Sequence, residues 1–386
     1  MDENSPAAAR VPMKKLRLNY RVVVPIAILL VIGIRLIWIE KLPAYLRPGQ
    51  HLFAYVANTA DGTISAIDLV RLAAVATIPV GAQPSGVRAH PTRPEIWGVS
   101  STAGVAWVLD ARSNSIVARI TTGAQPFALD FSADGRRAYV ASSGSNEILA
   151  IDCASRQIVA RGYAGRRPWI ARLTPDGKTL LVSNHDDSSV SLLDAKSLAA
   201  LGIVQVAPRP EQIAILPDSS KAFITSGGST QVSVVDLRRR VLLANLDIGG
   251  VPDDLDLKDD GGELYVTSAA AHGLEIINTE TNEAAEFLLV GSSPTQAALT
   301  ADNSLLFVSD SAAGHVVPIA IDQRKVARPI TVGQQPGPLR FTPGGDMLLV
   351  ADTQSNDLAV VRTSTGGLIT LIPVGTRPRD IAIKEF

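Results

Sequence analysis

The chain has little cysteine, few aromatic residues and almost no excess charge. Its single cysteine, Cys153, excludes an internal disulfide framework and any zinc or iron–sulfur site built from several cysteines. Aromatic residues make up 5% of the chain and are not interleaved with basic patches, so we predict no nucleic-acid partner. The formal net charge of -1 gives no overall field that would attract a polyanion or repel an acidic ligand.

Motifs that carry catalysis are also missing. The sequence has no Gly-x-Ser-x-Gly nucleophile elbow, no P-loop and no dinucleotide fingerprint. Of its 5 histidines, His185, His272 and His315 fall in loops that we expect on one face of the fold, but no His-x-x-x-His pair accompanies them. We therefore predict no metal site and no bound cofactor. A non-enzymatic protein is favoured, with one catalytic alternative.

Residues 22–39 form a long apolar run, interrupted by Arg35 near its end. Its length suffices to span a bilayer. Basic residues outnumber acidic ones before it, so the positive-inside rule places residues 1–21 in the cytoplasm and residues 51–386 in the periplasm or outside the cell, after a linker at 40–50. We expect an uncleaved, single-pass anchor. A cleaved signal peptide with residues 22–34 as its apolar core stays open, and it would export the same domain.

The rest of the chain repeats every 42 residues without insertion or deletion. Each repeat begins at a glycine, or at an alanine in one case, and carries a proline three residues later. A period near 40 residues is typical of propellers and solenoids, and no repeat shows the helical periodicity of about 3.6 residues. The recurring prolines are Pro84, Pro126, Pro168, Pro210, Pro252, Pro294, Pro336 and Pro378.

Each repeat predicts four short strands, named A to D in chain order. In the repeat that begins at Gly123 they are residues 127–131, 137–142, 148–152 and 158–161. Several C strands end in aspartate, and we expect these side chains to cap the turn that follows. These aspartates are Asp68, Asp110, Asp152, Asp194 and Asp236.

The two ends of the repeat region complement each other. Residues 51–80 supply strands B, C and D, and residues 375–386 supply strand A, which together make one repeat. A ring closed by its own termini removes the exposed terminal edges that an open solenoid would keep. The sequence thus predicts an all-β fold: an eight-bladed propeller of four-stranded repeats over residues 51–386, preceded by one transmembrane helix.

Short motifs in the strands resemble the YVTN family of β-propeller repeat proteins. The naming motif is present at residues 55–58, with related copies at 139–142 and 265–268. The resemblance covers residues 51–386 and implies a propeller in a prokaryotic surface or periplasmic setting. It also implies kinship with surface-layer, lactonase-like and haem-d1-type propellers. Seven blades is the commoner count among those relatives, so seven is the alternative to eight.

In such a propeller the B–C and D–A loops share one face, which we call the distal rim, and both termini lie on the other. A short linker turns the terminal face toward the bilayer and leaves the distal rim free for a partner. One sector of this rim has arginines beside an indole, which suits a planar anionic ligand or a partner's acidic segment. Solvated loop charges are the simpler interpretation. The sector comprises Arg166, Arg167, Trp169, His185, Asp186, Arg209 and Glu211.

Strand A lines the central channel, and charged residues recur at its inward-facing positions. Their signs alternate around the ring, which favours ion pairs that hold a wet channel together. A bound ion or small polar ligand is the alternative. The channel candidates are Arg88, Asp130, Arg172, Asp254, Asp256, Arg340 and Asp380.

A regular repeat without a catalytic constellation predicts a membrane-anchored, extracytoplasmic binding or scaffold module. We expect it to dock a protein or a small ligand on its distal rim. The alternative is a lactonase-like hydrolase or a haem- or metal-dependent redox propeller. A surface-coat module without a specific ligand is a third hypothesis.

Overall fold

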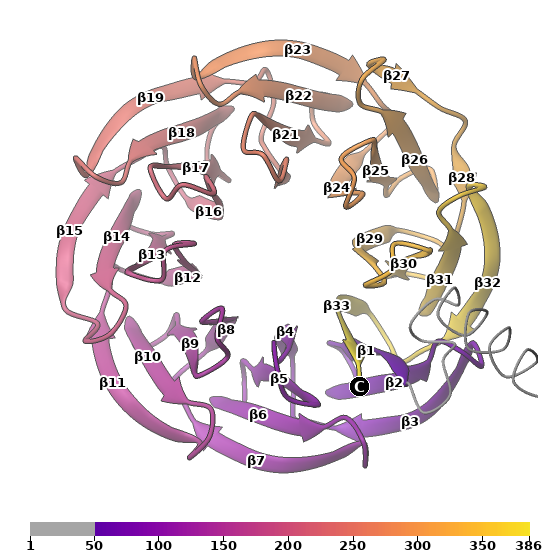
Figure 1. Cartoon of the computed structure of the whole chain (residues 1–386), viewed down its shortest axis with the longest axis horizontal. Coiled ribbons are helices and arrows are strands. Elements are labelled where there is room, and N and C mark those ends of the chain that lie inside the picture. The colour runs from indigo at the N-terminus through magenta and orange to yellow at the C-terminus, as the bar shows by residue number, and fades with distance from the viewer. Residues whose placement is uncertain (1–50) are drawn as a thin grey trace, which may run out of the picture. The chain divides into compact units, whose positions relative to one another are not determined.

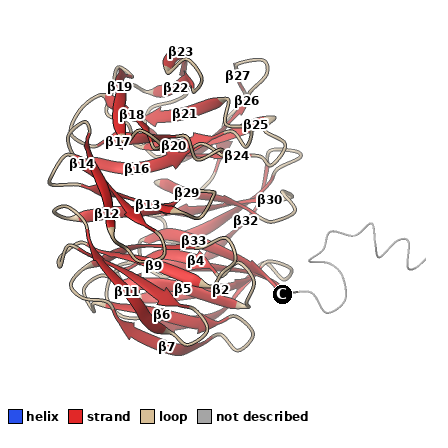
Figure 2. Cartoon of the chain, turned by 60° about the vertical axis from the view of Figure 1, so that its left-hand side comes forward, coloured by secondary structure: helices blue, strands red, loops and turns tan. Residues whose placement is uncertain are grey.

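The computed structural model describes residues 51–386, and all of the regular structure in that range is β-strand (Figures 1 and 2). The strands form eight separate antiparallel sheets arranged as a ring around a central channel. The structure therefore confirms eight blades rather than seven. We number the blades by their innermost strand, strand A, in chain order.

Blades 1 to 4 each contain four consecutive strands, from the channel outward. Blade 1 consists of β4 (Pro84–Ala89), β5 (Glu95–Ser100), β6 (Val105–Asp110) and β7 (Ser115–Thr121). Blade 2 consists of β8 (Pro126–Phe131), β9 (Arg137–Ser142), β10 (Glu147–Asp152) and β11 (Gln157–Tyr163). Blade 3 consists of β12 (Pro168–Leu173), β13 (Thr179–Asn184), β14 (Ser189–Asp194) and β15 (Ala200–Gln205). Blade 4 consists of β16 (Pro210–Ile215), β17 (Lys221–Ser226), β18 (Gln231–Asp236) and β19 (Val241–Asp247).

Blades 5 to 7 repeat this order, and blade 8 joins the two ends of the ring. Blade 5 consists of β20 (Asp254–Leu257), β21 (Glu263–Ser268), β22 (Gly273–Asn278) and β23 (Glu283–Leu289). Blade 6 consists of β24 (Pro294–Leu299), β25 (Leu305–Asp310), β26 (His315–Ala320), β27 (Lys325–Val326) and β28 (Ile330–Thr331). Blade 7 consists of β29 (Pro336–Phe341), β30 (Met347–Asp352), β31 (Asp357–Arg362) and β32 (Gly367–Pro373). Blade 8 consists of β33 (Pro378–Glu385), β1 (Leu52–Asn58), β2 (Thr63–Asp68) and β3 (Ala73–Pro79).

Blade 8 closes the ring as the leftover segments of the repeat predicted. β33 pairs antiparallel with β1 from Leu52 opposite Glu385 to Asn58 opposite Pro378. Beyond this ladder, His51 and Phe386 exchange two backbone hydrogen bonds of 2.9 and 3.0 Å. The ladder satisfies backbone groups that an open ring would expose at its two ends.

Hydrophobic side chains pack between neighbouring blades. Tyr55 of β1 and Trp107 of β6 belong to one buried cluster, which joins blade 8 to blade 1. Trp97 of β5 and Val140 of β9 belong to the next cluster, which joins blade 1 to blade 2. Strands B and C are buried on both faces, whereas the outer D strands alternate between exposed and half-buried residues, as in β7. Each blade is thus fixed by its two neighbours, and so are the channel walls.

The aspartates that end the C strands cap the following turns, as predicted. Asp68 accepts hydrogen bonds from the backbone N–H groups of Val70 and Arg71 at 2.9 and 3.0 Å. The other four accept the same kind of backbone bond from residues two or three positions further on. Blade 6 departs from the pattern, because Pro318 and Pro329 remove backbone donors and its outer strand is split into β27 and β28.

Within residues 51–386, no element is a helix long and apolar enough to cross a membrane. The predicted cytoplasmic segment at 1–21, the anchor at 22–39 and the linker at 40–50 lie outside the described residues.

Candidate functional site

A cavity of about 920 Å³, called the channel cavity below, lies in the channel and reaches the distal rim. Its mouth is formed by B–C loop residues such as Thr59 and Ser101 and by D–A loop residues such as Gln83 and Arg377. Every blade contributes to its wall at the same position of the repeat, which is two residues after the recurring proline. These eight residues are Gly86, Ala128, Ile170, Gln212, Asp254, Gln296, Pro338 and Asp380.

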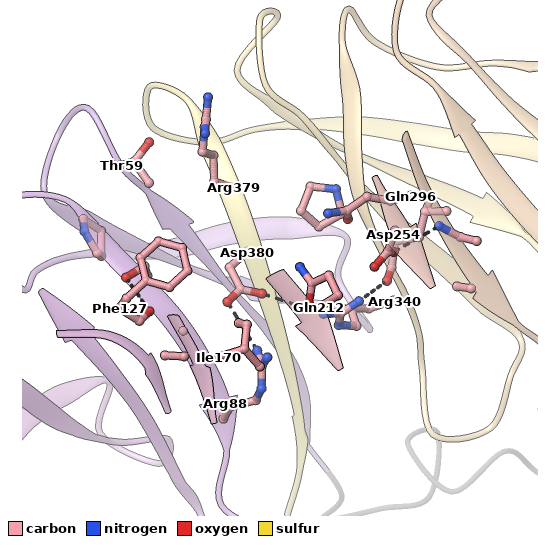
Figure 3. A pocket seen from close by; sticks show the side chains of 18 of the residues that line it. Thr59, Arg88, Phe127, Ile170, Gln212, Asp254, Gln296, Arg340, Arg379 and Asp380 are labelled. Carbon is pink, nitrogen blue, oxygen red and sulfur yellow. Dashed lines mark hydrogen bonds and ion pairs between the residues drawn. The ribbon is translucent and has the colours of Figure 1, made fainter. Parts of the chain in front are cut away.

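A second tier of side chains lies two positions further along the same strands. Residues two apart on a strand point to the same side, so this tier also faces the channel. Its members that line the cavity are Arg88, Arg172, Asp256, Ala298 and Arg340. These two tiers therefore combine three arginines with three aspartates, which come from five of the eight blades (Figure 3).

Asp380 is the best-compensated charge in the channel cavity. Its Oδ2 accepts a 2.8 Å hydrogen bond from the backbone N–H of Val87 and lies 3.3 Å from Arg88 Nη1. Its Oδ1 lies 3.9 Å from Arg340 Nη2. The two arginines also donate to their neighbouring backbone carbonyls, those of Val87 and Leu339. Asp380 thus joins blades 7, 8 and 1, and part of the predicted ion pairing is present (Figure 3).

Arg172 differs from the other two arginines. Within residues 51–386, its guanidinium has neither an ion pair nor a hydrogen bond. Burial lowers the pKa of Arg172; Asp130 and Asp380 oppose that effect, whereas Arg88 and Arg340 add to it. The site therefore holds a positive charge that its own wall does not neutralise.

Asp254 and Asp256 form an acidic part of the cavity wall on β20. Burial raises the pKa of Asp254 to about 7, with a further contribution from the negative charge of Asp256, while Arg340 acts in the other direction. Burial likewise raises the pKa of Asp256 to about 6. Each carboxylate accepts one backbone N–H from blade 6, from Ala297 at 3.4 Å and from Leu299 at 2.7 Å. Neither forms an ion pair in the described part of the chain.

Asp130, the remaining channel candidate, is occupied by the backbone and does not line the channel cavity. It accepts hydrogen bonds from Phe131 N at 3.0 Å and from Leu173 N of the next blade at 3.4 Å. The same link between strand A of one blade and strand A of the next recurs at the other channel aspartates. The channel aspartates therefore have a structural role, because these bonds satisfy backbone N–H groups at the inner edge of the ring.

The structure brings the predicted rim sector together, but its charges are largely paired with one another. Arg166 binds Asp187, and Arg167 lies 3.7 Å from Asp186. Asp186 also lies 2.8 Å from Nδ1 of the buried His185. Arg209 donates from Nε to His185 Nε2 at 3.3 Å and lies 4.0 Å from Glu211. This sector is a network with few unused charges, which weakens the case for it as a docking site.

The aromatic part of the sector reaches the channel cavity. Trp169 stacks on Phe127, with ring centroids 3.6 Å apart, and Arg167 lies over the Trp169 ring at 5.3 Å. Phe127 itself lines the cavity wall. The sequence analysis missed Phe127, as well as Gln296, Arg377 and Arg379. Gln296 could have been found, because it stands at the same repeat offset as Asp254 and Asp380.

Within residues 51–386, no three histidine, cysteine or acidic side chains are grouped so that they could hold a metal ion. Cys153 is buried, and burial raises the pKa of its thiol to about 12. A thiol with that pKa is protonated at neutral pH and is a weak nucleophile.

Comparisons with known proteins find solved structures with a similar fold. The chain is similar in structure to dihydro-haem d1 dehydrogenase NirN in complex with DHE, with a TM-score of 0.74 and 16% identity over 85% of this chain and 74% of that one. It is also similar to Kuenenia stuttgartiensis hydrazine synthase, with a TM-score of 0.59 and 17% identity over 73% of this chain and 96% of that one. A functionally unknown protein from Desulfotomaculum acetoxidans DSM 771 has a TM-score of 0.59 and 13% identity over 86% and 98% of the two chains.

At these identities the structural similarity concerns the fold alone. No curated protein matches the chain by sequence. The profile of one protein family does match, over residues 105–304, which is more than half of the chain. The match begins in blade 1 and ends in blade 6, and it therefore includes β12 with Arg172 and β20 with the aspartate pair. The chain belongs to the YNCE-like β-propeller family.

Proposed function

We propose that this propeller is a binding protein that holds a small anionic molecule in its channel cavity. The observation that carries the proposal is Arg172, a half-buried residue whose side chain lines a cavity of about 920 Å³ and whose guanidinium has no ion-pair or hydrogen-bond partner within residues 51–386. A guanidinium without a protein partner leaves its N–H donors free, and an anionic ligand would supply acceptors for them.

The chemistry of the wall favours a carboxylate or phosphate group. A guanidinium presents parallel N–H donors that match the two oxygens of such groups. Arg88 and Arg340 share the tier of Arg172, and Arg377 and Arg379 line the mouth of the cavity. This succession of arginines from the mouth inward would attract an anion and guide it to Arg172.

The membrane anchor remains part of the proposal. The chain enters the ring at β1 and leaves it at β33, on the side away from the B–C and D–A loops that form the cavity mouth. An anchor at residues 22–39 followed by a short linker would therefore leave the mouth free to collect a ligand in the periplasm or outside the cell. The apolar sequence of that segment and the basic residues before it support this arrangement.

A hydrolase is the second candidate, and one observation favours it. A carboxyl group with a pKa of about 7, as at Asp254, is suited to general acid–base catalysis near neutral pH. If the protein is lactonase-like, Asp254→Asn will abolish lactone hydrolysis by the full-length chain. A binding protein has no such activity to lose.

The binding proposal is tested with Arg172→Gln in the full-length chain. Titration calorimetry with acetate, succinate and inorganic phosphate should show at least one anion that binds the native chain and binds the variant at least about tenfold more weakly, the worth of one charge-assisted hydrogen bond. Arg167→Gln, which changes a rim arginine that does not line the cavity, is the matched control and should bind like the native chain. Equal affinity in the native and Arg172→Gln proteins would overturn the proposal.

A further inference from the structure

The aspartate pair of β20 forms no ion pair within residues 51–386, although the charge of Arg340 acts on both carboxyl groups and lowers their pKa values. Asp254 and Asp256 each use one oxygen to accept a backbone N–H from blade 6, and no basic side chain of residues 51–386 forms an ion pair with either of them. Asp380, by contrast, contacts both Arg88 and Arg340. The two aspartates are half-buried in the wall, and burial raises both of their pKa values.

The pair is shaped for a hydrogen-bond donor rather than for a metal ion. The two residues are separated by one position on a strand, which places their Cα atoms about 7 Å apart along the wall. A metal ion needs several oxygen atoms within about 2.5 Å, whereas an ammonium group donates three hydrogen bonds in different directions. Gln212 of blade 4 and Gln296 of blade 6 flank the pair and line the same cavity, and their amide oxygens can accept from the same group (Figure 3).

A second, independent feature of the cavity complements this negative wall. The unpartnered guanidinium of Arg172 belongs to blade 3, and the aspartate pair belongs to blade 5. Only blade 4 lies between them, and it presents Gln212 and Ile213 to the cavity. The cavity therefore carries charges of opposite sign on walls two blades apart, and within residues 51–386 these charges form no ion pair.

We propose that the ligand is amphoteric: an anionic group binds Arg172 while an ammonium group of the same molecule binds between Asp254 and Asp256. This inference rests on the proposed anion site and adds the second pole to it. One molecule that bridges the two walls would bind both the Arg172 guanidinium and the two aspartates, whereas a simple anion or a simple cation would bind only one of these walls. The fitting chemical class is a small amino acid or amine that also bears a carboxylate, with its two charged ends separated by a short spacer.

The test compares molecules that differ only in the ammonium group. Calorimetry on the full-length chain uses γ-aminobutyrate and ε-aminohexanoate against butyrate and hexanoate, with butylamine as the amine alone. We expect the best amino acid to bind at least about tenfold more tightly than the carboxylate of the same chain length. Asp254→Asn combined with Asp256→Asn should remove that advantage and leave the affinity for the plain carboxylate unchanged or higher.

Three kinds of result would contradict the inference, and they separate it from the proposed function. If butyrate and γ-aminobutyrate, and likewise the longer pair, bind equally well and both depend on Arg172, the anion site stands and the ammonium site is wrong. If no probe of the panel binds, or if Arg172→Gln binds them all like the native chain, both proposals fail. Tight binding of calcium alone that the double variant abolishes would assign the aspartates to a metal ion instead.

Proton release provides a second readout. At a pH just below 7, part of the Asp254 population is protonated, and an ammonium group beside it stabilises the ionised form. Binding of an amino acid should therefore release protons, whereas binding of a plain carboxylate should not. The heat of binding measured in buffers of different ionisation enthalpy gives the number released. Equal proton release for both ligand types would overturn the inference.

Discussion

Replacing Asp352 by asparagine should stabilise the propeller, and increasingly so as the pH rises. Asp352 ends strand B of blade 7 and is fully buried. One of its oxygens accepts a hydrogen bond from Gly333 N at 3.1 Å, whereas its Oδ1 and the Oδ1 of the neighbouring Asp357 are buried without a partner among the described residues. Burial and the neighbouring Asp357 carboxylate, with which a protonated Asp352 can share its proton, raise the pKa of Asp352 to about 9.

Blades 3 and 8 show how asparagine fits this position. Asn184 in blade 3 accepts the backbone N–H of Gly165 with its oxygen and donates with Nδ2 to Ser189 and Ser191. Asn58 in blade 8 donates in the same way to two hydroxyl groups. An asparagine at 352 would accept from Gly333 and donate to the Asp357 carboxylate, so it needs no added proton.

The magnitude follows from the two pKa values. The native aspartate keeps its proton up to about pH 9, whereas in the unfolded chain it loses it near its ordinary value of 3.8. Between these values the folded state binds more protons than the unfolded state, so the stability of the native protein falls as the pH rises. A pH of 7 is about three units above the ordinary pKa of aspartate, and each unit corresponds to about 1.4 kcal/mol. The free-energy cost of keeping Asp352 protonated at pH 7 is therefore at most about 4 kcal/mol. Because a coupled, buried pair relaxes, we expect a gain of about 1–3 kcal/mol for Asp352→Asn at pH 7.

The assay is guanidinium unfolding of both proteins between about pH 4 and pH 9, the range set by the two pKa values. The variant should match the native chain at the acid end and exceed it progressively toward the alkaline end. Asp310→Asn is the matched control, because Asp310 holds the same position in blade 6 but accepts two backbone N–H bonds of 2.8 Å. It should lose about 1–2 kcal/mol at neutral pH. A variant at 352 that is less stable than the native chain at every pH would refute the shared proton.

Three further results are expected. Gly98→Ala should destabilise the ring by about 1–3 kcal/mol in the same unfolding assay, because an added Cβ would lie 2.3 Å from the buried ring of Trp107; a neutral effect would contradict the close packing of Trp107 over Gly98 within blade 1. Asp380→Asn should raise the affinity for a bound anion several-fold in calorimetry, because it releases Arg88 and Arg340 and keeps an oxygen for Val87 N; weaker binding would contradict this. A phosphatase fused after residue 386, of the kind that is active only outside the cytoplasm, should be active, and an inactive fusion would refute export.

The sequence predicted the ring, because each blade repeats the same local chemistry at a fixed interval. The prolines mark where strand A begins in most blades, and the leftover segments pair as β1 and β33. The predicted strands of the Gly123 repeat agree with β8 to β11 within one or two residues. These features depend on neighbouring residues and on periodicity, which a single sequence contains.

The channel could be predicted only in part. Strand A periodicity identified the residues that face inward, but their pairing depends on side-chain reach across blades. Arg88 and Asp380 are 292 positions apart and meet only because the ring closes. The alternating signs suggested that all of the channel charges would pair, whereas Arg172 and the β20 aspartates form no ion pair within the described part of the chain. In the rim sector the charges pair more than the sequence suggested, because the loop geometry lets Arg166 and Arg167 reach Asp187 and Asp186.

The most direct test of the anion site is a crystal structure of the full-length chain soaked in selenate, which anomalous scattering locates without ambiguity. The account predicts an anomalous peak inside the channel cavity within hydrogen-bond distance of the Arg172 guanidinium, and its loss in Arg172→Gln. A guanidinium of Arg172 that instead turns to pair with Asp130, with no anion beside it, would contradict the account.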